Sequence, residues 1–223
     1  EAKNAASLGQ VHKATINGEE IACKLQYPDM VSTVDADLKQ LKLIFSLYGT
    51  WDKTIKTKEI YNELSERLKE ELDYKREFKN MLLFNEMLHD QKYINIPKPI
   101  NKLSTDRLLT MSWLNGKSFM KYKNSSSEVK NHLALTLFYA WYIPFYKYGI
   151  IHGDPHPGNY PVDSSNKNKP SINLLDFGCI RVFPANFVKG VIDLYIAMRD
   201  DNYDLAITAY KSWGFNDLSK DLI

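Results

Sequence analysis

The residues best suited to catalysis lie in the run His152-Gly153-Asp154-Pro155-His156-Pro157-Gly158-Asn159, which Asp176-Phe177-Gly178 follows a short way downstream. The carboxylate of Asp154 could take the proton of an attacking hydroxyl or water molecule. The amide oxygen of Asn159 and the carboxylate of Asp176 are hard oxygen ligands of the kind that bind Mg²⁺. This spacing predicts a phosphoryl-transfer site in which Asp154 is the catalytic carboxylate and Asn159 and Asp176 hold the metal. We expect the rest of the chain to bring a nucleotide to this loop.

Length and composition limit the class of protein. The chain has 223 residues, enough for one large domain or two lobes, and its net charge is +2, which gives no reason to expect nucleic-acid binding. Cys23 and Cys179 lie far apart in a chain with no signal-peptide pattern, so we expect free thiols in a reducing compartment. No apolar run is long enough to span a bilayer. The chain begins inside a motif and ends inside a helical pattern, which indicates a fragment of a longer protein.

The N-terminal part reads as a small-residue loop over Asn4–Gln10 followed by a hairpin. Strands are expected over Val11–Ile16 and Glu20–Gln26, because Asn17-Gly18 is a strong two-residue turn signal. Backbone N–H groups of a small-residue loop can approach phosphates closely, and Lys24 on the following strand can point at the same phosphates. Taken alone, Lys24 would more often be a solvated strand lysine, but its apolar neighbours on the strand and the downstream motif favour contact with phosphates.

Two amphipathic helices should follow, over Val34–Tyr48 and over a long segment from about Lys58 to Leu88. Most charged residues of the second helix fit a solvated face with i,i+4 pairs. Glu77 is the exception, since it stands at the edge of the apolar face. From there it could pair with Lys24 and hold the ammonium against nucleotide phosphates.

The remaining elements are expected in the following order: an extended segment over Ile96–Ile100, a strand over Arg107–Leu114, a helix capped by Ser125–Ser127 that Gly149 ends, short strands over Tyr160–Val162 and Ile172–Leu175, and helices over Pro184–Arg199 and Tyr203–Trp213. The sequence shows no internal repeat.

With these residues in place, the chain closely resembles the UbiB atypical kinase family over nearly its whole length. The resemblance is carried by the motifs Ala5-Ala6-Ser7-Leu8-Gly9-Gln10-Val11-His12, Ala22-Cys23-Lys24-Leu25-Gln26, Glu71-x-Asp73-x-x-x-Glu77-x-x-Asn80, HGDPHPGN and LLDFG. That family has a protein-kinase-like fold and is associated with ubiquinone biosynthesis.

The resemblance implies an α+β, two-lobed protein-kinase-like fold. A small β-rich N-lobe with extra helices would cover residues 1–114, and a mainly helical C-lobe would cover residues 115–223. It further implies a magnesium-dependent ATP-using enzyme, with ATP or ADP and Mg²⁺ as cofactors. Isoprenoid lipid or quinone-biosynthesis proteins are expected partners, and the expected location is the cytoplasm or the periphery of the inner membrane, reached through segments outside this chain.

Individual residues take roles from the same resemblance. Lys24 would position the phosphates, Glu77 would be its helix partner, Asp154 the catalytic aspartate, and Asn159 and Asp176 the metal ligands. Nucleotide contacts are expected from Ala5, Ala6, Ser7, Gly9 and Lys24, and from the backbone of Ser112 and Leu114 where a kinase hinge would lie. Glu71 and Asp73 match the family's E-x-D motif.

The sequence departs from the family pattern in three places. Asn4 stands where the family usually has Ala or Gly. Pro161 follows the catalytic loop, where it allows only an edge pairing, because proline has no N–H to donate. The K-x-G-Q motif that precedes the nucleotide loop in the family does not occur in this sequence.

Three other interpretations stay open. A small-molecule kinase of the aminoglycoside or choline type also has HGDxHxxN followed by an aspartate on a strand, although the Ala-Ser-Leu-Gly-Gln loop argues against it. A pseudokinase-like scaffold would bind nucleotide and isoprenoid lipid without turnover. A zinc site could be built from His152, Asp154 and His156, whereas in the principal interpretation His152 is a packed residue that anchors the loop.

Overall fold

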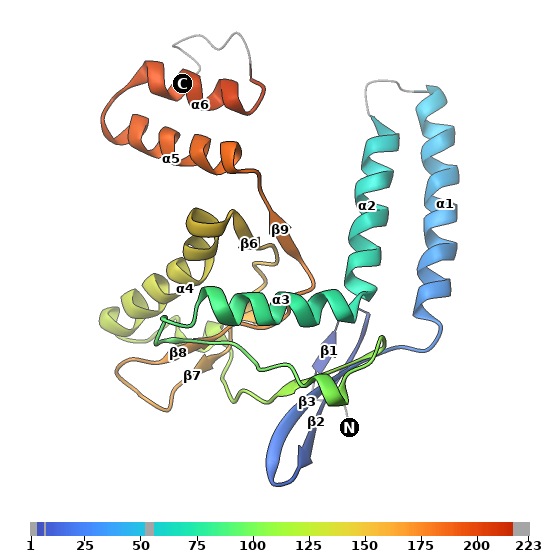
Figure 1. Cartoon of the computed structure of the whole chain (residues 1–223), viewed down its shortest axis with the longest axis vertical. Coiled ribbons are helices and arrows are strands. Elements are labelled where there is room, and N and C mark those ends of the chain that lie inside the picture. The colour runs from blue at the N-terminus through green and yellow to red at the C-terminus, as the bar shows by residue number, and fades with distance from the viewer. Residues whose placement is uncertain (1–3, 7, 52–55, 216–223) are drawn as a thin grey trace.

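The computed structural model describes residues 4–6, 8–51 and 56–215 of the chain. Its largest sheet is antiparallel, with strand order β1-β2-β3-β5. The strands are β1 (Asn4–Ala6), β2 (Gly9–Ile16), β3 (Glu19–Gln26) and β5 (Leu108–Ser112). Figure 1 shows this sheet at the lower end of the molecule, with both β2 and β3 running into one long hairpin.

The small-residue segment before β2 is a hairpin rather than an open loop. Asn4, Ala5 and Ala6 pair with Val11, Gln10 and Gly9. Ser7 lies outside the described residues, as do the side chains of residues 4–6. The backbone of this segment is therefore held by sheet hydrogen bonds before any ligand binds.

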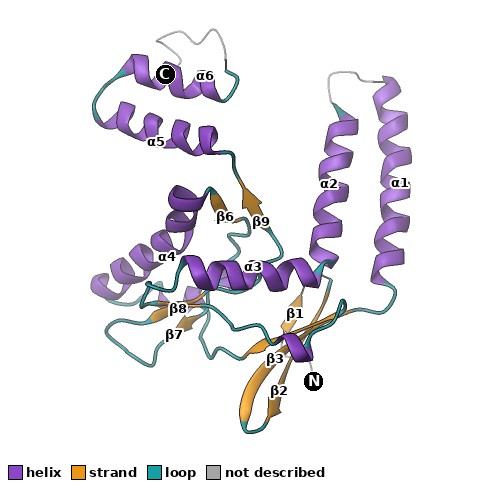
Figure 2. Ribbon diagram, in the orientation of Figure 1, coloured by secondary structure: helices purple, strands orange, loops and turns teal. Residues whose placement is uncertain are grey.

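Three helices follow the β2–β3 hairpin: α1 (Met30–Trp51), α2 (Thr57–Leu72) and α3 (Tyr74–Met87). Helices α1 and α2 stand side by side and project away from the sheet, whereas α3 crosses the middle of the molecule (Figure 2). Helix α1 is longer at both ends than the segment predicted from the sequence.

The single long helix expected from Lys58 to Leu88 is wrong, because it breaks at Asp73. Asp73 has φ −88° and ψ 84°, and its Oδ1 accepts a hydrogen bond of 2.9 Å from the backbone N–H of Arg76. It is thus the N-cap of α3, a position that aspartate favours. On the other side of the break, Gln26 Nε2 donates to the last carbonyl of α2, at Leu72, over 2.5 Å. Capping on both sides allows α3 to take a new direction.

Up to residue 215, the rest of the chain forms two small sheets, three α-helices and three short 3-10 helices, at Asn101–Leu103, Phe119–Tyr122 and Pro157–Asn159. One sheet has the order β4-β8-β7 and the other pairs β6 with β9. The strands are β4 (Ile94–Asn95), β6 (Ile150–His152), β7 (Val162–Asp163), β8 (Ser171–Asn173) and β9 (Ile180–Val182), and the helices are α4 (Ser127–Tyr148), α5 (Ala185–Arg199) and α6 (Tyr203–Ser212). Because β7 is an edge strand, the preceding Pro161 is accommodated as expected.

Helix α4 has the ends that its sequence predicts. The side chain of Ser126 accepts a hydrogen bond from the N–H of Val129 and caps the helix. The helix continues through Pro144 and ends at Gly149, whose φ of 69° lies in the left-handed region. Glycine adopts this conformation at little cost. Gly149 thus turns the chain directly into β6 and the loop at residues 153–159.

The buried core joins α3 to the strands of the second half. Its members are Tyr74, Met81, Phe84, Met87, Leu88, Leu109, Leu133, Tyr160, Val162, Ile172, Leu174, Phe177 and Ile180. The rings of Phe84 and Phe177 lie 5.2 Å apart, so the phenylalanine of the Asp-Phe-Gly motif is part of this core. The site residues therefore rest on the same packing that holds α3.

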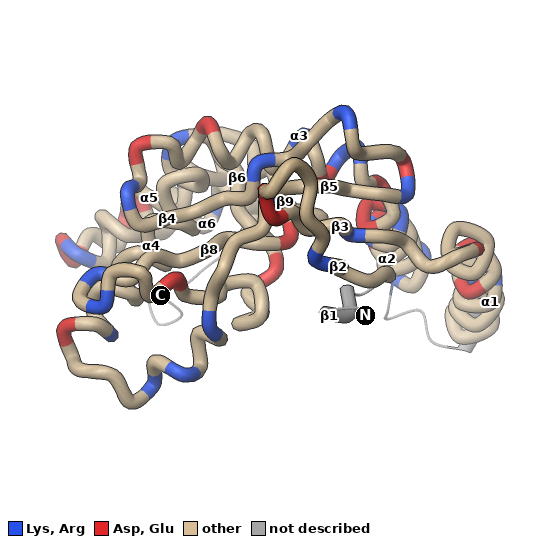
Figure 3. The backbone as a smooth tube through the Cα atoms, turned by 90° about the horizontal axis from the view of Figure 1, so that it is seen from below, with Lys and Arg blue, Asp and Glu red and all other residues tan. Residues whose placement is uncertain are grey.

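The elements gather in two groups, seen from below in Figure 3. The large sheet with α1 and α2 lies on one side, and the small sheets with α4, α5 and α6 lie on the other. Strand β4 precedes residue 114 but pairs in parallel with β8, so the first part of the chain contributes a strand to the second group. Among the described residues, no helix combines the length and the hydropathy needed to cross a membrane.

Replacing Gly149 should destabilise the protein more than replacing Gly18. Both have positive φ, at 69° and 82°, but a Cβ on Gly149 would lie 2.7 Å from the carbonyl oxygen of Phe183, whereas one on Gly18 has nothing within 4 Å. We expect Gly149→Ala to lower the free energy of unfolding by about 2 kcal/mol or more, and Gly18→Ala by about 1 kcal/mol. Urea denaturation of the two variants measures the difference, and equal effects would show that the Phe183 contact is easily relieved.

Candidate active site

An ion pair between Lys24 and Glu77 forms the centre of the site. Lys24 is on β3 and Glu77 is in the first turn of α3, and the Nζ atom of Lys24 lies 2.9 Å from both carboxylate oxygens. The side chain of Glu77 is 4% exposed and that of Lys24 is 11% exposed. The ammonium also lies 5.5 Å from the centre of the Tyr74 ring, within the range of a cation–π interaction. The pair that the sequence predicts is therefore formed and largely buried.

Burial and charge act in opposite directions on this pair. Burial by itself would lower the pKa of Lys24, but the carboxylates of Glu77 and Asp176 outweigh it and hold that pKa above its ordinary value. Burial raises the pKa of the Glu77 carboxyl, and the Lys24 ammonium opposes this rise. Lys24 consequently stays protonated, as a residue that holds phosphates must be.

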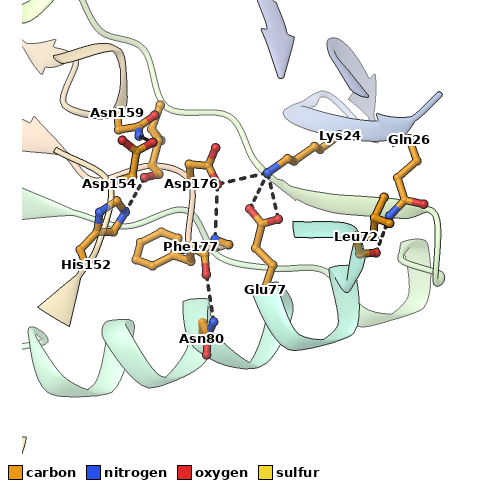
Figure 4. A network of polar contacts seen from close by, with 12 residues as sticks. Lys24, Gln26, Leu72, Glu77, Asn80, His152, Asp154, Asn159, Asp176 and Phe177 are labelled. Atoms are coloured by element: carbon orange, nitrogen blue, oxygen red, sulfur yellow. Dashed lines mark hydrogen bonds and ion pairs between the residues drawn. The ribbon is translucent and has the colours of Figure 1, made fainter. Parts of the chain in front are cut away.

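Asp176 contacts the same ammonium from the other half of the molecule. Its Oδ1 lies 3.3 Å from Lys24 Nζ and accepts a hydrogen bond of 3.3 Å from the N–H of Gly178. Burial acts to raise the pKa of Asp176, but the charge of Lys24 and the Gly178 hydrogen bond outweigh it, so the pKa is lowered. Asp176 has φ 59°, a left-handed conformation that aspartate tolerates better than most residues. Figure 4 shows its carboxylate between Lys24 and the catalytic loop.

Helix α3 also holds the Asp-Phe-Gly segment through its backbone. Asn80, one turn after Glu77, donates from Nδ2 to the carbonyl oxygen of Phe177 over 2.9 Å. The sequence motif includes Asn80, but no role could be assigned to it from the sequence. The structure indicates that Asn80 and Glu77 together fix the position of Asp176 relative to Lys24.

The loop from Gly153 to Asn159 is folded on itself by hydrogen bonds to Asp154. Its Oδ2 accepts from Asn159 Nδ2 over 2.6 Å and its Oδ1 accepts from the N–H of His156 over 3.1 Å. The hydroxyl of Tyr160 donates to the backbone oxygen of Asp154 over 2.8 Å. Asp154 and Asn159 are thus brought together as the sequence predicts, and Tyr160 is a supporting residue that the sequence reasoning missed.

His152 connects the loop to the strand before Asp176. It is fully buried, and its Nε2 lies 2.9 Å from the carbonyl oxygen of Leu175. Its ring makes a T-shaped contact with that of Phe177 at 5.5 Å. Burial lowers the pKa of His152, which favours the neutral imidazole with the proton on Nε2. This is the packed, anchoring residue that the principal interpretation expects.

The zinc interpretation finds no support in this arrangement. His152 is committed to Leu175, and Nδ1 of His156 accepts from the N–H of Gly158 over 3.1 Å. Across the residues that the structure describes, no group of three or more His, Cys, Asp or Glu side chains could hold a metal ion.

Two oxygen ligands could nevertheless hold Mg²⁺ together with phosphates and water. Nδ2 of Asn159 donates to Asp154, and the amide oxygen of Asn159 is therefore directed away from that carboxylate. Oδ1 of Asp176 accepts hydrogen bonds from Lys24 and Gly178, which leaves Oδ2 as the oxygen that could bind a metal ion. Asn159 and Asp176 lie close together, since the carbonyl of Asn159 accepts from the N–H of Leu175 over 2.9 Å. Magnesium usually takes one or two protein oxygens and completes its octahedron with phosphate and water, so this donor set fits it.

The residues expected to contact the nucleotide lie in different local environments. Gly9 is buried, and a Cβ there would collide with the carbonyl of Leu25 and approach the Tyr74 hydroxyl to 3.0 Å, so a glycine is needed for packing. The N–H of Ser112 donates to the carbonyl of Lys98 over 2.9 Å. The Ser112 N–H therefore already has a hydrogen-bond partner, whereas Leu114 lies in irregular structure after β5. Roles for Ala5, Ala6, Ser7, Gly9, Ser112 and Leu114 in nucleotide binding stay predictions.

The two acidic residues of the E-x-D motif lie at the corner between α2 and α3. Asp73 caps α3, as described above, and so helps to orient the helix that carries Glu77. Glu71, in the last turn of α2, is half-buried and contributes electrostatically to raising the pKa of Cys179, which is raised mainly by burial. Of the two motif residues, Glu71 is thus the one near the segment that follows Asp-Phe-Gly, whereas Asp73 is exposed. Cys23 and Cys179 are both free thiols.

Comparison with known proteins finds kinase-like relatives. A sequence profile described as the "ABC1 atypical kinase-like domain" matches residues 1–209. The Arabidopsis thaliana protein "ACTIVITY OF BC1 COMPLEX KINASE 8, chloroplastic" is 29% identical over 94% of this chain and 28% of its own length. "Atypical kinase COQ8, mitochondrial" from Saccharomyces cerevisiae is 29% identical over 88% of this chain and 39% of its own length. The chain therefore spans well under half of these relatives.

A solved structure shows the same fold. Rv3197 from Mycobacterium tuberculosis, determined in complex with erythromycin, is 26% identical, with a TM-score of 0.77 over 99% of this chain and 56% of that chain. Together with the kinase-like profile, this match confirms the α+β, protein-kinase-like fold that the sequence predicts.

Acid should destabilise the protein through His152. Because the folded-state pKa lies below the ordinary 6.5, only the unfolded state binds a proton there as the pH falls below 6.5. The free energy of unfolding should then fall by up to about 1.4 kcal/mol per pH unit until the folded pKa is reached. Urea denaturation between pH 7 and pH 5.5 measures this slope, and His152→Asn should flatten it.

His89→Gln is the matched control. A backbone hydrogen bond at Glu86 and the nearby Asp90 raise the pKa of this exposed histidine, so its own contribution favours the folded state in acid. Removing His89 should leave the fall of the unfolding free energy with decreasing pH unchanged or make it steeper. A slope that His152→Asn does not change would show that another group causes the acid sensitivity.

Proposed function

The chain belongs to the family of ABC1 atypical kinase-like domains, and from this premise we propose that it is a magnesium-dependent ATP-using phosphotransferase or ATPase. The observation that carries the proposal is the contact of one ammonium with two carboxylates. Lys24 meets Glu77 at 2.9 Å and Asp176 at 3.3 Å, although the three residues come from β3, α3 and the segment after β8. A purely structural ion pair would not need the second carboxylate. A second carboxylate is expected, however, where a phosphate-binding lysine lies beside a metal ligand.

Each residue of the site has a distinct role in this proposal. Lys24, oriented by Glu77, would bind the nucleotide phosphates. Asn159 and Asp176 would hold Mg²⁺, which neutralises the charge that develops on the transferred phosphoryl group. Asp154, whose two oxygens are held by Asn159 and the N–H of His156, would orient the attacking hydroxyl or water and accept its proton.

We further propose that turnover supports the synthesis of an isoprenoid quinone lipid. This rests on the resemblance to UbiB-type proteins and on relatives such as the yeast COQ8 atypical kinase. Isoprenoid lipid or quinone-biosynthesis proteins would be the partners, and adenine nucleotide would be the small-molecule ligand. Hydrolysis of ATP coupled to lipid synthesis suits this assignment better than phosphorylation of a protein. Attachment to a membrane periphery would depend on segments outside this chain.

Asp176→Asn should strongly reduce magnesium-dependent turnover. The amide keeps the side-chain shape and tolerates the positive φ, but it removes the charge that holds the metal. We expect kcat for ATP hydrolysis to fall by about 10² to 10³-fold, measured as phosphate release by the full-length protein at saturating Mg²⁺.

Asp201→Asn is a matched control, because Asp201 is exposed and also has a positive φ, of 49°. It should retain parental activity. Parental activity in Asp176→Asn would remove that residue from the metal role, and absence of turnover in the parent protein would favour the nucleotide-binding scaffold. Phosphorylated product from soluble alcohols or amino sugars would favour the small-molecule kinase instead.

A further inference from the structure

A second ionic cluster lies beside the site and is centred on Glu70. Glu70 is near the end of α2, and its carboxylate contacts three guanidinium groups from three elements. Arg67 of α2 donates from Nη1 to Oε2 of Glu70 over 2.6 Å, and Arg181 of β9 donates from Nη1 to the same oxygen over 3.4 Å. Nη2 of Arg76, in α3, lies 3.0 Å from Oε1 of Glu70. One carboxylate thus ties α2, α3 and β9 together.

Arg181 connects this cluster to the catalytic residues. Strand β9 begins two residues after Gly178, and it pairs with β6, which ends at His152 immediately before the catalytic loop. The side chain of Arg181 also runs over that loop, because its Cγ would lie 3.3 Å from a Cβ on Gly153. Figure 1 shows β9 passing next to the end of α2 that bears Glu70. The β6–β9 pair, which follows the Asp176 segment and precedes the Asp154 loop, is therefore attached to α2 through Arg181 and Glu70.

The balance of charge makes Glu70 the residue on which the cluster depends. Three guanidinium groups surround it, whereas the carboxylate of Glu63 is 59% exposed, contacts Arg67 at 2.6 Å and acts on Arg181 only through its charge, from farther away. Within the described part of the chain, Arg76 Nη1 is buried without a hydrogen-bond partner. Without the Glu70 charge the three cations would repel one another at short range. Arg181 would then have reason to turn to solvent and release β9.

We propose that Glu70 is a positioning residue that sets the distance between the Lys24–Glu77 pair and the carboxylates of Asp154 and Asp176. It acts through Arg76 on the helix that bears Glu77, and through Arg181 on the β6–β9 pair that adjoins the segments of the two aspartates. This inference rests on the proposed function for its kinetic consequence, but its structural consequence is independent of turnover. The metal step should be most affected, because Asp176 is the ligand closest in sequence to β9.

Glu70→Gln in the full-length protein tests the proposal, with Glu63→Gln as the matched control on the same helix. In Glu70→Gln we expect kcat to fall about tenfold and the Mg²⁺ concentration at half-maximal activity to rise severalfold, with KM for ATP within about threefold of the parent. Hydrogen exchange of the β9 amides, at residues 180–182, should accelerate about tenfold. Glu63→Gln should leave all of these values at the parental level.

A double-mutant cycle with Arg181→Gln decides whether the two residues act together. The acceleration of exchange in the double variant should equal that in either single variant, since both break the same contact; additive effects would overturn the proposal. Unchanged β9 exchange in Glu70→Gln would overturn it as well, even if activity is lost. If the parent protein shows no ATP turnover, the proposed function fails while the exchange measurements still test the role of Glu70. If Glu70→Gln does not fold, Arg181→Gln alone must show the faster exchange and the raised Mg²⁺ requirement.

Discussion

The buried contact between Lys24 and Glu77 is the constraint on which the rest of this structure depends. Removing two charges from water is expensive, and their attraction offsets that cost only when the geometry is held closely. Here a strand of the large sheet and the first turn of α3 supply the two partners, and both oxygens of Glu77 lie 2.9 Å from the ammonium. The scaffold must therefore fix α3 against the sheet, and most of the architecture can be understood as doing so.

Three features fix α3. Asp73 ends the preceding helix and caps α3, so that the chain can turn towards β3 at this point. Phe84 packs against Phe177 in the core, and Asn80 binds the backbone of Phe177. The same helix thus positions a glutamate for the lysine and a backbone carbonyl for the segment that carries Asp176. Fold and site share these contacts, and a change that moves α3 should disturb both.

Much of this could be predicted from the sequence because it depends on motifs and capping residues that can be recognised there. The Lys24–Glu77 pair, the contact between Asp154 and Asn159, and the ends of α4 follow from motif spacing and from capping residues. The break at Asp73 could not be found by periodicity, because the apolar stripe runs on across it; the capping preference of aspartate was the available signal. The β6–β9 and β4–β8 pairings join short strands far apart in the chain, and the Glu70 cluster depends on that long-range placement.

The contact between Lys24 and Asp176 has a thermodynamic consequence. At 3.3 Å the carboxylate is neutralised by the same ammonium that would bind phosphate. A cation that takes Asp176 as a ligand frees Lys24 for the nucleotide, and a nucleotide that takes Lys24 leaves Asp176 uncompensated and attractive to a cation. The two ligands should consequently bind with positive linkage, each raising the affinity for the other by the same factor. Either ligand must break the resting ion pair to bind alone, so the pair disfavours nucleotide without its metal before any chemistry begins.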